Sequence, residues 1–460
     1  MNETILNQRA REEFGLDENL NEIYFEPITS QEVIEVLGLT IKKDEENKLV
    51  TFLCQLSAYT RDSQFNISFN APSSTGKSYI PTEIARLFPE ADVIEVGYCS
   101  PTAFFHDVGK YDKEKEGYIV DLSRKILIFL DQPHTLLLQH LRPMLSHDKK
   151  EIRLKITDKS QKFGLKTKNI FLKGFPAVIF CTAGLKIDEQ ETTRFLLLSP
   201  ETDYEKIRQA IQEKIKKEAD NEAYLNWLEE DPKRRSLKER IKAIKRENIK
   251  EINIGYPEKI EQRFFAQTKV LKPRHQRDIG RIISLIKAFA LLNLWHRERK
   301  SSTIVANEED IEEAFKIWYA ISESQEYNLP PYIYNLYLDV ILTAWNEKNQ
   351  KRTHGFEEVT GPLGLTRREV TQKHLQVYSR VLADWLLRQQ IIPMLENAGL
   401  ITQEPDPSDK RKMLIYPTTP LTISGDERNS ELDGGVNQNN SELNGGVKEK
   451  TVVSSASPEY

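Results

Sequence analysis

The chain has 460 residues, of which 39% are hydrophobic and 29% are charged, and its formal net charge is -5. This length allows two or three domains with cores of their own, and no apolar run is long enough to span a bilayer. The negative charge argues against a wholly basic nucleic-acid-binding surface, although a total can hide local basic patches.

The cysteines and the N-terminus indicate a compartment. Cys54, Cys99 and Cys181 lie far apart in separate apolar stretches, which favours neither a disulfide framework nor a zinc site. The first residues lack the basic flank and apolar core of a secretory signal. We therefore expect a protein of the reducing cytoplasm.

Residues 1–45 are polar with a few apolar anchors, and we interpret them as an N-terminal extension. From 46 to 200, short apolar runs alternate with helical patterns, which predicts an α/β domain with a parallel sheet covered on both faces. The expected strands are residues 65–69, 91–96, 125–130, 177–181 and 195–198.

The stretch APSSTGKSY follows the first expected strand and precedes a helical pattern. A phosphate loop needs backbone N–H groups at a helix N-terminus, a lysine for the terminal phosphates and a hydroxyl for magnesium. Gly76, Lys77 and Ser78 supply these features, and Ala71 can replace the usual first glycine if its φ stays negative. The expected nucleotide-binding residues are Ala71, Pro72, Ser73, Ser74, Thr75, Gly76, Lys77, Ser78 and Tyr79.

A second element lies about fifty residues further on. The apolar run 125–130 ends in Asp131, which we expect at the carboxyl edge of the sheet, holding Mg²⁺ together with Ser78. The next residue is Gln132, whereas enzymes that hydrolyse a nucleotide at a phosphate loop usually have a glutamate there that activates water. An amide orients water but accepts no proton, so either another carboxylate such as Glu95 serves or hydrolysis is slow. Glu95 also fits a solvated strand end.

Beyond residue 200 the pattern changes. Residues 201–328 are charged with apolar residues at helical spacing, which predicts a helical lid domain, and Pro330 with Pro331 marks its end. Residues 329–418 form a third domain. The tail, 419–460, is rich in Ser, Asn, Gly and Glu and has too little apolar area to offset ordering, so we expect it to be disordered.

The third domain resembles a winged helix. Helical patterns at 332–344, 364–370 (with Thr366 as a cap) and 378–395 precede two short strands, 400–403 and 413–416, that flank a charged tip. Residues 363–416 hold eight basic and six acidic residues, so a protein-docking role stays open. If the domain binds duplex DNA, the expected phosphate contacts are Arg367, Arg368, Lys373, Lys410, Arg411 and Lys412.

The order of these elements over about residues 46–320 resembles the AAA+ ATPases, in particular the branch that includes the minichromosome maintenance helicases. The resemblance implies Thr182 as the sensor 1 residue and Arg194 as the arginine that reaches a neighbouring subunit's nucleotide. It implies Arg277 as the sensor 2 arginine, with Arg274 in reserve. Arg194 also fits a sheet-edge cap, and the lid arginines also fit a solvated basic face.

Residues 149–173 carry nine basic and two acidic residues and read as two strands around a polar turn. This segment resembles the hairpin before sensor 1 that lines the channel of helicase-like AAA+ rings. Its lysines would neutralise phosphates, although a basic hairpin can also simply deter strand pairing. The expected DNA contacts are Lys155, Lys159, Lys162, Lys166 and Lys168.

Together these features predict an ATP- and Mg²⁺-dependent AAA+ ATPase that forms a homo-oligomeric, hexameric ring. Single-stranded DNA would pass through the channel, duplex DNA would contact the winged helix, and no membrane is involved. The expected role is a replicative or mobile-element helicase. The alternatives are a slowly hydrolysing, ATP-controlled DNA-binding switch and an AAA+ remodeller of protein partners.

Overall fold

The computed structural model describes residues 25–97, 110–158, 166–182, 194–267, 271–353 and 362–418, all within one structural unit that ends at Thr418. The predictions for the tail 419–460, for Lys159 and Lys162 and for Cys99 lie outside these residues. Lys166 is described in its backbone alone.

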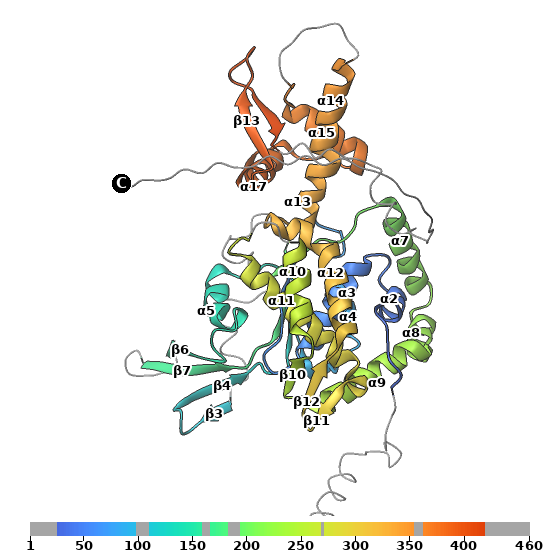
Figure 1. The fold of residues 1–460 in the computed structure, drawn as a ribbon, viewed down its shortest axis with the longest axis vertical. Helices are drawn as coiled ribbons and strands as arrows, with labels where there is room; N and C mark the ends of the chain where they lie inside the picture. Colours follow the sequence, from blue (N-terminus) through green and yellow to red (C-terminus); the bar gives the residue numbers. More distant parts are fainter. Residues whose placement is uncertain are drawn as a thin grey trace, which may run out of the picture. The chain divides into compact units, whose positions relative to one another are not determined.

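A five-stranded parallel sheet forms the centre of the protein, in the order β2-β5-β8-β1-β9 (Figure 1). All five expected strands are confirmed, with end points that shift by one or two residues. Strand β1 pairs with β8 on one side and with β9 on the other. The strands are β1 (Ile67–Asn70), β2 (Val93–Val96), β5 (Ile126–Phe129), β8 (Ala177–Thr182) and β9 (Leu196–Leu198).

Both faces of this sheet are covered by hydrophobic clusters, and β5 and β9 are apolar at every position. Ile126 and Ile128 of β5 face one hydrophobic cluster, whereas Leu127 and Phe129 face another. Such alternation is the expected consequence of a two-residue side-chain period. The covering helices are α3 (Glu45–Ser57), α4 (Tyr79–Ala85) and α5 (Thr135–Leu145), and η1 (Glu90–Asp92) precedes β2.

The described part of the predicted N-terminal extension contributes to the main core. Helix α2 (Ser30–Gly38) begins with a capping box between Thr29 and Glu32. Its Val33 and Leu37 are buried in the same hydrophobic cluster as α3 and one face of the sheet.

The predicted basic hairpin is present as strands β6 (Glu151–Asp158) and β7 (Lys166–Lys173), which pair antiparallel. A second hairpin, formed by β3 (Lys110–Asp112) and β4 (Gly117–Asp121), was not expected. It pairs with β7 and gives a four-stranded sheet in the order β3-β4-β7-β6, which Figure 1 shows at the lower left.

The region predicted as a helical lid, residues 201–328, is mainly helical, but it also contains a three-stranded sheet that was not predicted, in the order β10-β12-β11. Its helices α11 and α12 share a hydrophobic cluster with α3 and the central sheet. The elements are α7 (Tyr204–Ala219), α8 (Asn221–Glu230), α9 (Pro232–Glu247), β10 (Glu251–Ile254), α10 (Pro257–Gln267), α11 (His275–Leu292), η3 (Leu294–His296), β11 (Glu298–Lys300), β12 (Thr303–Ala306) and α12 (Glu308–Glu326).

The C-terminal region, residues 329–418, has a hydrophobic cluster of its own and ends in an antiparallel hairpin, as expected. Thr366 caps α15 through a capping box with Glu369. The helix expected at 378–395 starts late, because Ser379 adopts a left-handed φ of 51° that ends α15. The elements are α13 (Pro331–Leu336), η4 (Tyr337–Leu342), α14 (Thr343–Thr353), α15 (Arg367–Tyr378), α16 (Asp384–Leu386), η5 (Leu387–Ile391), α17 (Ile392–Asn397), β13 (Ile401–Pro405) and β14 (Met413–Pro417).

Candidate nucleotide-binding site

The phosphate-loop sequence forms the turn between β1 and α4, at the carboxyl edge of the central sheet. Ser74 and Gly76 have φ values of 67° and 96°, in the left-handed region that glycine adopts without strain. A Cβ on Gly76 would meet nothing within 4 Å, so the backbone conformation and not space requires glycine there. Ala71 is not among the residues with positive φ, as its tolerance in the loop demands.

Lys77 folds back over this turn. Its Nζ donates a hydrogen bond to the Pro72 carbonyl at 2.9 Å, and its own carbonyl accepts one from Cys181 Sγ at 3.4 Å. Partial burial lowers the pKa of Lys77, while Asp131 acts on that pKa in the opposite direction. Lys77 and Asp131 therefore both lie at the carboxyl edge of the sheet, which fits a site for a phosphate with a divalent metal.

The other expected site residues at this edge come from β5 and β8, which are neighbours in the sheet. Asp131 Oδ1 accepts a hydrogen bond from its neighbour's backbone N–H at 2.8 Å. Thr182 Oγ1 donates to Gln132 Oε1 at 3.1 Å. The structure therefore brings Gln132 and Thr182 together, whereas Glu95 lies within strand β2, opposite Ile128.

Burial of Cys181 raises the pKa of its thiol to about 12, so the group is a neutral neighbour of Lys77 and not a thiolate. Among the described residues, no cluster of three or more His, Cys, Asp or Glu side chains is placed to hold a metal ion. Ser78, which is exposed, and Asp131 would accordingly hold Mg²⁺ mainly through its waters and the phosphates, as this ion prefers.

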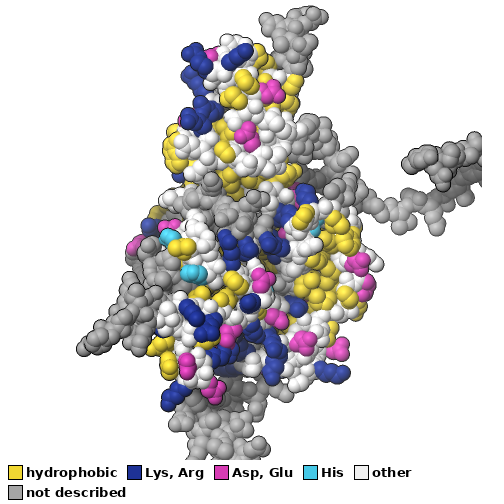
Figure 2. Space-filling view, turned by 90° about the vertical axis from the view of Figure 1, so that its left-hand side faces the viewer, with side chains coloured by type: hydrophobic (Ala, Val, Ile, Leu, Met, Phe, Trp, Pro, Cys, Tyr) yellow, Lys and Arg dark blue, Asp and Glu magenta, His cyan; other side chains and the backbone are white. Residues whose placement is uncertain are grey.

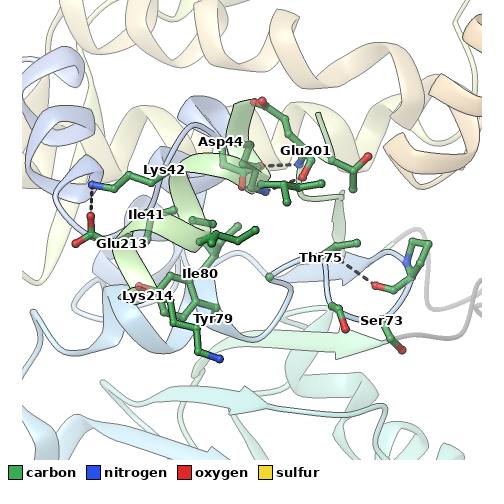
Figure 3. Close-up of a pocket in the computed structure, with 18 of the residues that line it drawn as sticks. Ile41, Lys42, Asp44, Ser73, Thr75, Tyr79, Ile80, Glu201, Glu213 and Lys214 are labelled. Atoms are coloured by element: carbon green, nitrogen blue, oxygen red, sulfur yellow. Dashed lines mark hydrogen bonds and ion pairs between the residues drawn. The ribbon is translucent and has the colours of Figure 1, made fainter. Parts of the chain in front are cut away.

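A cavity of about 870 Å³ adjoins the phosphate loop. Figure 3 shows one wall of it, where Lys42 pairs with Glu213 of α7 at 2.9 Å. Buried Asp44 pairs with Lys206 of α7 and accepts the backbone N–H of Glu201. Helix α7 is thus fixed by ion pairs to the segment before α3. Residues that line the cavity include Thr40, Ile41, Lys42, Asp44, Pro72, Ser73, Ser74, Thr75, Gly76, Tyr79, Ile80, Glu201, Ile207, Ile211, Glu213, Tyr332, His374, Tyr378 and Arg380.

Arg194 and Arg277 line a different cavity, of about 520 Å³. Arg194 precedes β9, which runs parallel to β1, so it lies at the sheet edge opposite the phosphate loop. Its Nε donates to Ser146 Oγ at 2.8 Å. The two predicted arginines therefore line one cavity together, and this cavity is not the one that adjoins the phosphate loop.

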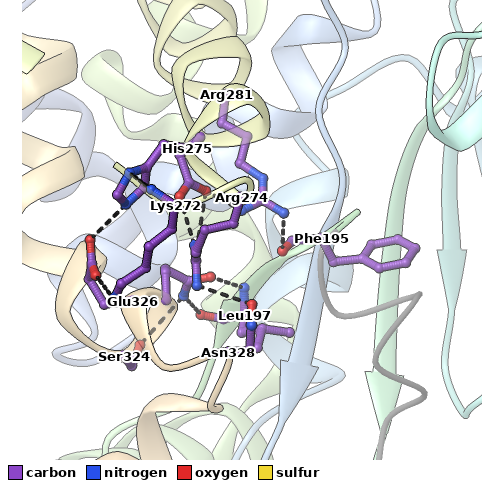
Figure 4. Close-up of polar contacts among 11 residues, drawn as sticks. Phe195, Leu197, Lys272, Arg274, His275, Arg281, Ser324, Glu326 and Asn328 are labelled. Carbon is purple, nitrogen blue, oxygen red and sulfur yellow. Dashed lines mark hydrogen bonds and ion pairs between the residues drawn. The ribbon is translucent and has the colours of Figure 1, made fainter. Parts of the chain in front are cut away.

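Arg274 belongs to a polar network inside the lid, drawn in Figure 4. Its guanidinium forms two hydrogen bonds with Asp278, at 2.8 and 3.2 Å, and a third with Asn328. Arg281, which was not a candidate residue, donates to Asp278 and to the carbonyl of Phe195 at 2.8 Å. This network ties α11 to the start of β9.

The second cavity also contains His147, whose imidazole packs edge-on against Phe175. Burial lowers the pKa of His147 below its ordinary 6.5, although Asp62 and Asp148 act the other way. Below about pH 6.5 the unfolded chain then binds more protons than the folded chain, so the free energy of unfolding falls as the pH falls.

We expect His147→Asn to lose less thermal stability than wild type between about pH 7.5 and about pH 5.5, because asparagine tolerates the left-handed φ of this position and does not titrate. Thermal melts of both proteins at each pH measure the difference. Equal losses in the two proteins would contradict a neutral, buried His147.

The expected DNA contacts on the hairpin are partly described. Lys155 is exposed, and Lys168 Nζ lies 5.4 Å from the ring centre of Tyr118. Figure 2 views the side on which β6 and β7 lie in Figure 1, and there Lys and Arg gather in groups with Asp and Glu among them.

Most of the basic residues expected on the C-terminal region have acidic neighbours. Arg367 pairs with Asp384 at 3.6 Å, and Lys373 pairs with Glu347 at 2.5 Å. In the loop between β13 and β14, Arg411 and Lys412 both pair with Asp409. Arg368 lies on α15 next to Arg367, and Lys410 lies next to Arg411 in the loop between β13 and β14.

Comparison with protein families finds no matching family model, and comparison with curated proteins finds no match. None of the helices in the described ranges is long and apolar enough to cross a membrane. The contacts above thus provide the basis for a functional assignment.

Proposed function

We propose that the protein is an ATP-dependent, DNA-binding ATPase of the AAA+ type. The observation that carries this proposal is the meeting of the phosphate loop, Asp131 and Thr182 at the carboxyl edge of one parallel sheet. Ligands of open α/β sheets bind at this edge. The strand order β2-β5-β8-β1-β9 and the hairpin inserted before β8 support the resemblance to AAA+ ATPases.

In this proposal the turn at Ser74 to Lys77 binds the phosphates, while Ser78 and Asp131 hold the metal ion. Bound ATP would supply the phosphoryl group that is transferred to water, and Mg²⁺ would neutralise the charge of its phosphates. The apolar side of the adjoining cavity, with Ile41, Ile207 and Ile211, suits the base of a nucleotide.

Arg194 and Arg277 lie away from this chain's own phosphate loop but line one cavity together. Their separation from Lys77 supports a role toward the nucleotide of a second copy, in a homo-oligomeric ring. Two arginines that approach a triphosphate from a neighbour would stabilise its charge as the bond breaks.

The hairpin β6–β7 is the proposed DNA-binding element. Replacing Lys155 and Lys168 together by alanine should weaken binding of single-stranded DNA. The plot of log affinity against log salt should become shallower by about 1.4, because each lysine that neutralises a phosphate contributes about 0.7. Filter binding or fluorescence anisotropy at several salt concentrations gives this slope. The matched control is Lys300→Ala on exposed β11, and an unchanged slope in the double variant would favour a remodeller of protein partners.

Gln132 supports the second candidate function, a slowly hydrolysing DNA-binding switch. Its side chain is neutral and accepts a hydrogen bond from Thr182, so it cannot serve as the base. An assay of DNA-stimulated ATP hydrolysis distinguishes a helicase from a switch, with Lys77→Ala as the inactive reference. A helicase should hydrolyse ATP faster with DNA and separate a forked duplex, whereas a switch should bind the fork without unwinding it.

A further inference from the structure

The C-terminal region (residues 329–418) is bonded to the base of the phosphate loop. The carbonyl of Asn70, the last residue of β1, accepts a hydrogen bond from Ser199 Oγ at 2.6 Å. The same hydroxyl oxygen accepts the backbone N–H of Tyr332, in the first turn of α13, at 3.0 Å. Asn70 is fully buried and directly precedes the loop, so this junction fixes the start of the C-terminal region beside it.

The end of α15 is also held in place. Ser379 leaves the helix with a left-handed φ, which redirects the chain at Arg380. The Arg380 carbonyl accepts a hydrogen bond from Nδ1 of His374 at 2.8 Å, and His374 is only 1% exposed. The neighbouring Tyr378 donates its hydroxyl to Asp339 at 2.9 Å. His374 therefore positions the backbone of Arg380.

Arg380 is exposed and lines the same cavity as Ser73 and Ser74 of the phosphate loop. His374 lines this cavity too, and its buried Nε2 has no hydrogen-bond partner within the described part of the chain. Burial lowers the pKa of this imidazole, which therefore stays neutral and offers Nε2 as an acceptor.

Arg380 brings a positive charge of the C-terminal region to the cavity that the phosphate loop also lines. A guanidinium is always charged and offers several donors that match the oxygens of a phosphate.

We propose that Arg380 binds the terminal phosphate of the nucleotide that the phosphate loop of its own chain holds, so that the C-terminal region distinguishes a triphosphate from a diphosphate. This inference rests on the proposed function, since it assigns a further binding residue to the same site. His374 is the positioning residue. Because the α13 junction and Arg380 belong to one region, the nucleotide state is coupled to the position of the predicted winged helix.

The test compares Arg380→Ala with Arg388→Ala, an exposed arginine of the same region that does not line the cavity. Affinities for ATP and ADP, each with Mg²⁺, are measured on the full chain by displacement of a fluorescent ADP analogue. We expect Arg380→Ala to bind ATP about 10-fold more weakly and ADP within about 2-fold of wild type, because one charge-assisted contact is lost from the terminal phosphate alone. Arg388→Ala should resemble wild type for both nucleotides.

An unchanged ATP affinity in Arg380→Ala, or an equal loss for ATP and ADP, would overturn the inference. The proposed function would survive that result, provided wild type binds nucleotide and Lys77→Ala does not. If wild type itself binds neither nucleotide, the proposed function fails and the inference fails with it.

Discussion

Replacement of Lys77 by alanine is expected to weaken nucleotide binding by about 100-fold or more. The ammonium group lies at the phosphate loop, where its Nζ bonds to the Pro72 carbonyl. Charge-assisted hydrogen bonds contribute about 1.5–3 kcal/mol each, and a lysine at this position would contact two phosphates. Displacement of a fluorescent nucleotide gives the affinity, and a thermal melt without nucleotide checks that the variant is folded.

Lys316→Ala provides the control for loss of one positive charge. This lysine lies on α12, its side chain is 76% exposed, and its Nζ lies 4.0 Å from a carboxylate oxygen of Glu313. It should bind nucleotide like wild type. If a folded Lys77→Ala protein also kept wild-type affinity, the loop would not be the phosphate site.

Replacement of Asp278 by alanine should lower the free energy of unfolding by about 3–5 kcal/mol. Asp278 is 3% exposed and forms ion pairs with both Arg274 and Arg281. Removing it takes the counter-charge from the buried guanidinium of Arg281 and the partly buried one of Arg274, and this is the costly way to break a buried ion pair. Burial already lowers the pKa of Arg281 to about 10, which shows how poorly solvated that group is. Urea denaturation followed by circular dichroism measures the change.

The matched control removes an exposed carboxylate from the same region. Glu312 pairs with Arg263 at 2.9 Å, but the glutamate side chain is 54% exposed. Glu312→Ala should therefore cost at most about 1 kcal/mol. Similar losses in the two variants would mean that the network around Asp278 does not hold α11 to β9.

The central sheet could be predicted from the sequence because β5 and β9 are continuous apolar runs, β8 is nearly so, and β1 alternates apolar with polar residues. Residues such as Ile126 to Phe129 are buried on both faces, and no helical period competes with that pattern. The phosphate loop and Asp131 could be located for the same reason, since each directly follows such a strand.

The hairpin of β3 and β4 and the sheet of β10, β11 and β12 were not predicted, because strands such as β3 and β11 lack an apolar signal of their own. Strand β11 is Glu298–Lys300 and is exposed throughout, and it exists only through pairing with β12. Strand β3 likewise depends on β4, which is stabilised by parallel pairing with β7 about fifty residues away.

The interaction partners of the arginines in residues 274–281 also could not be predicted from the sequence. Arg274, Arg277 and Arg281 follow one another on a basic helix, and nothing in their spacing shows which of them pairs internally. That outcome depends on Asp278 within the helix and on the carbonyl of Phe195, 86 residues from Arg281. Arg380 gave no signal either, because its position depends on the left-handed turn at Ser379.

Calorimetric titration of the full chain with ATP in the presence of Mg²⁺ tests the nucleotide site most directly. We predict saturable binding of about one nucleotide per chain, weakened when Mg²⁺ is withheld, because Ser78 and Asp131 would then lack the ion they share with the phosphates. A folded protein that releases or absorbs no heat with ATP at any concentration up to about 1 mM would contradict the account.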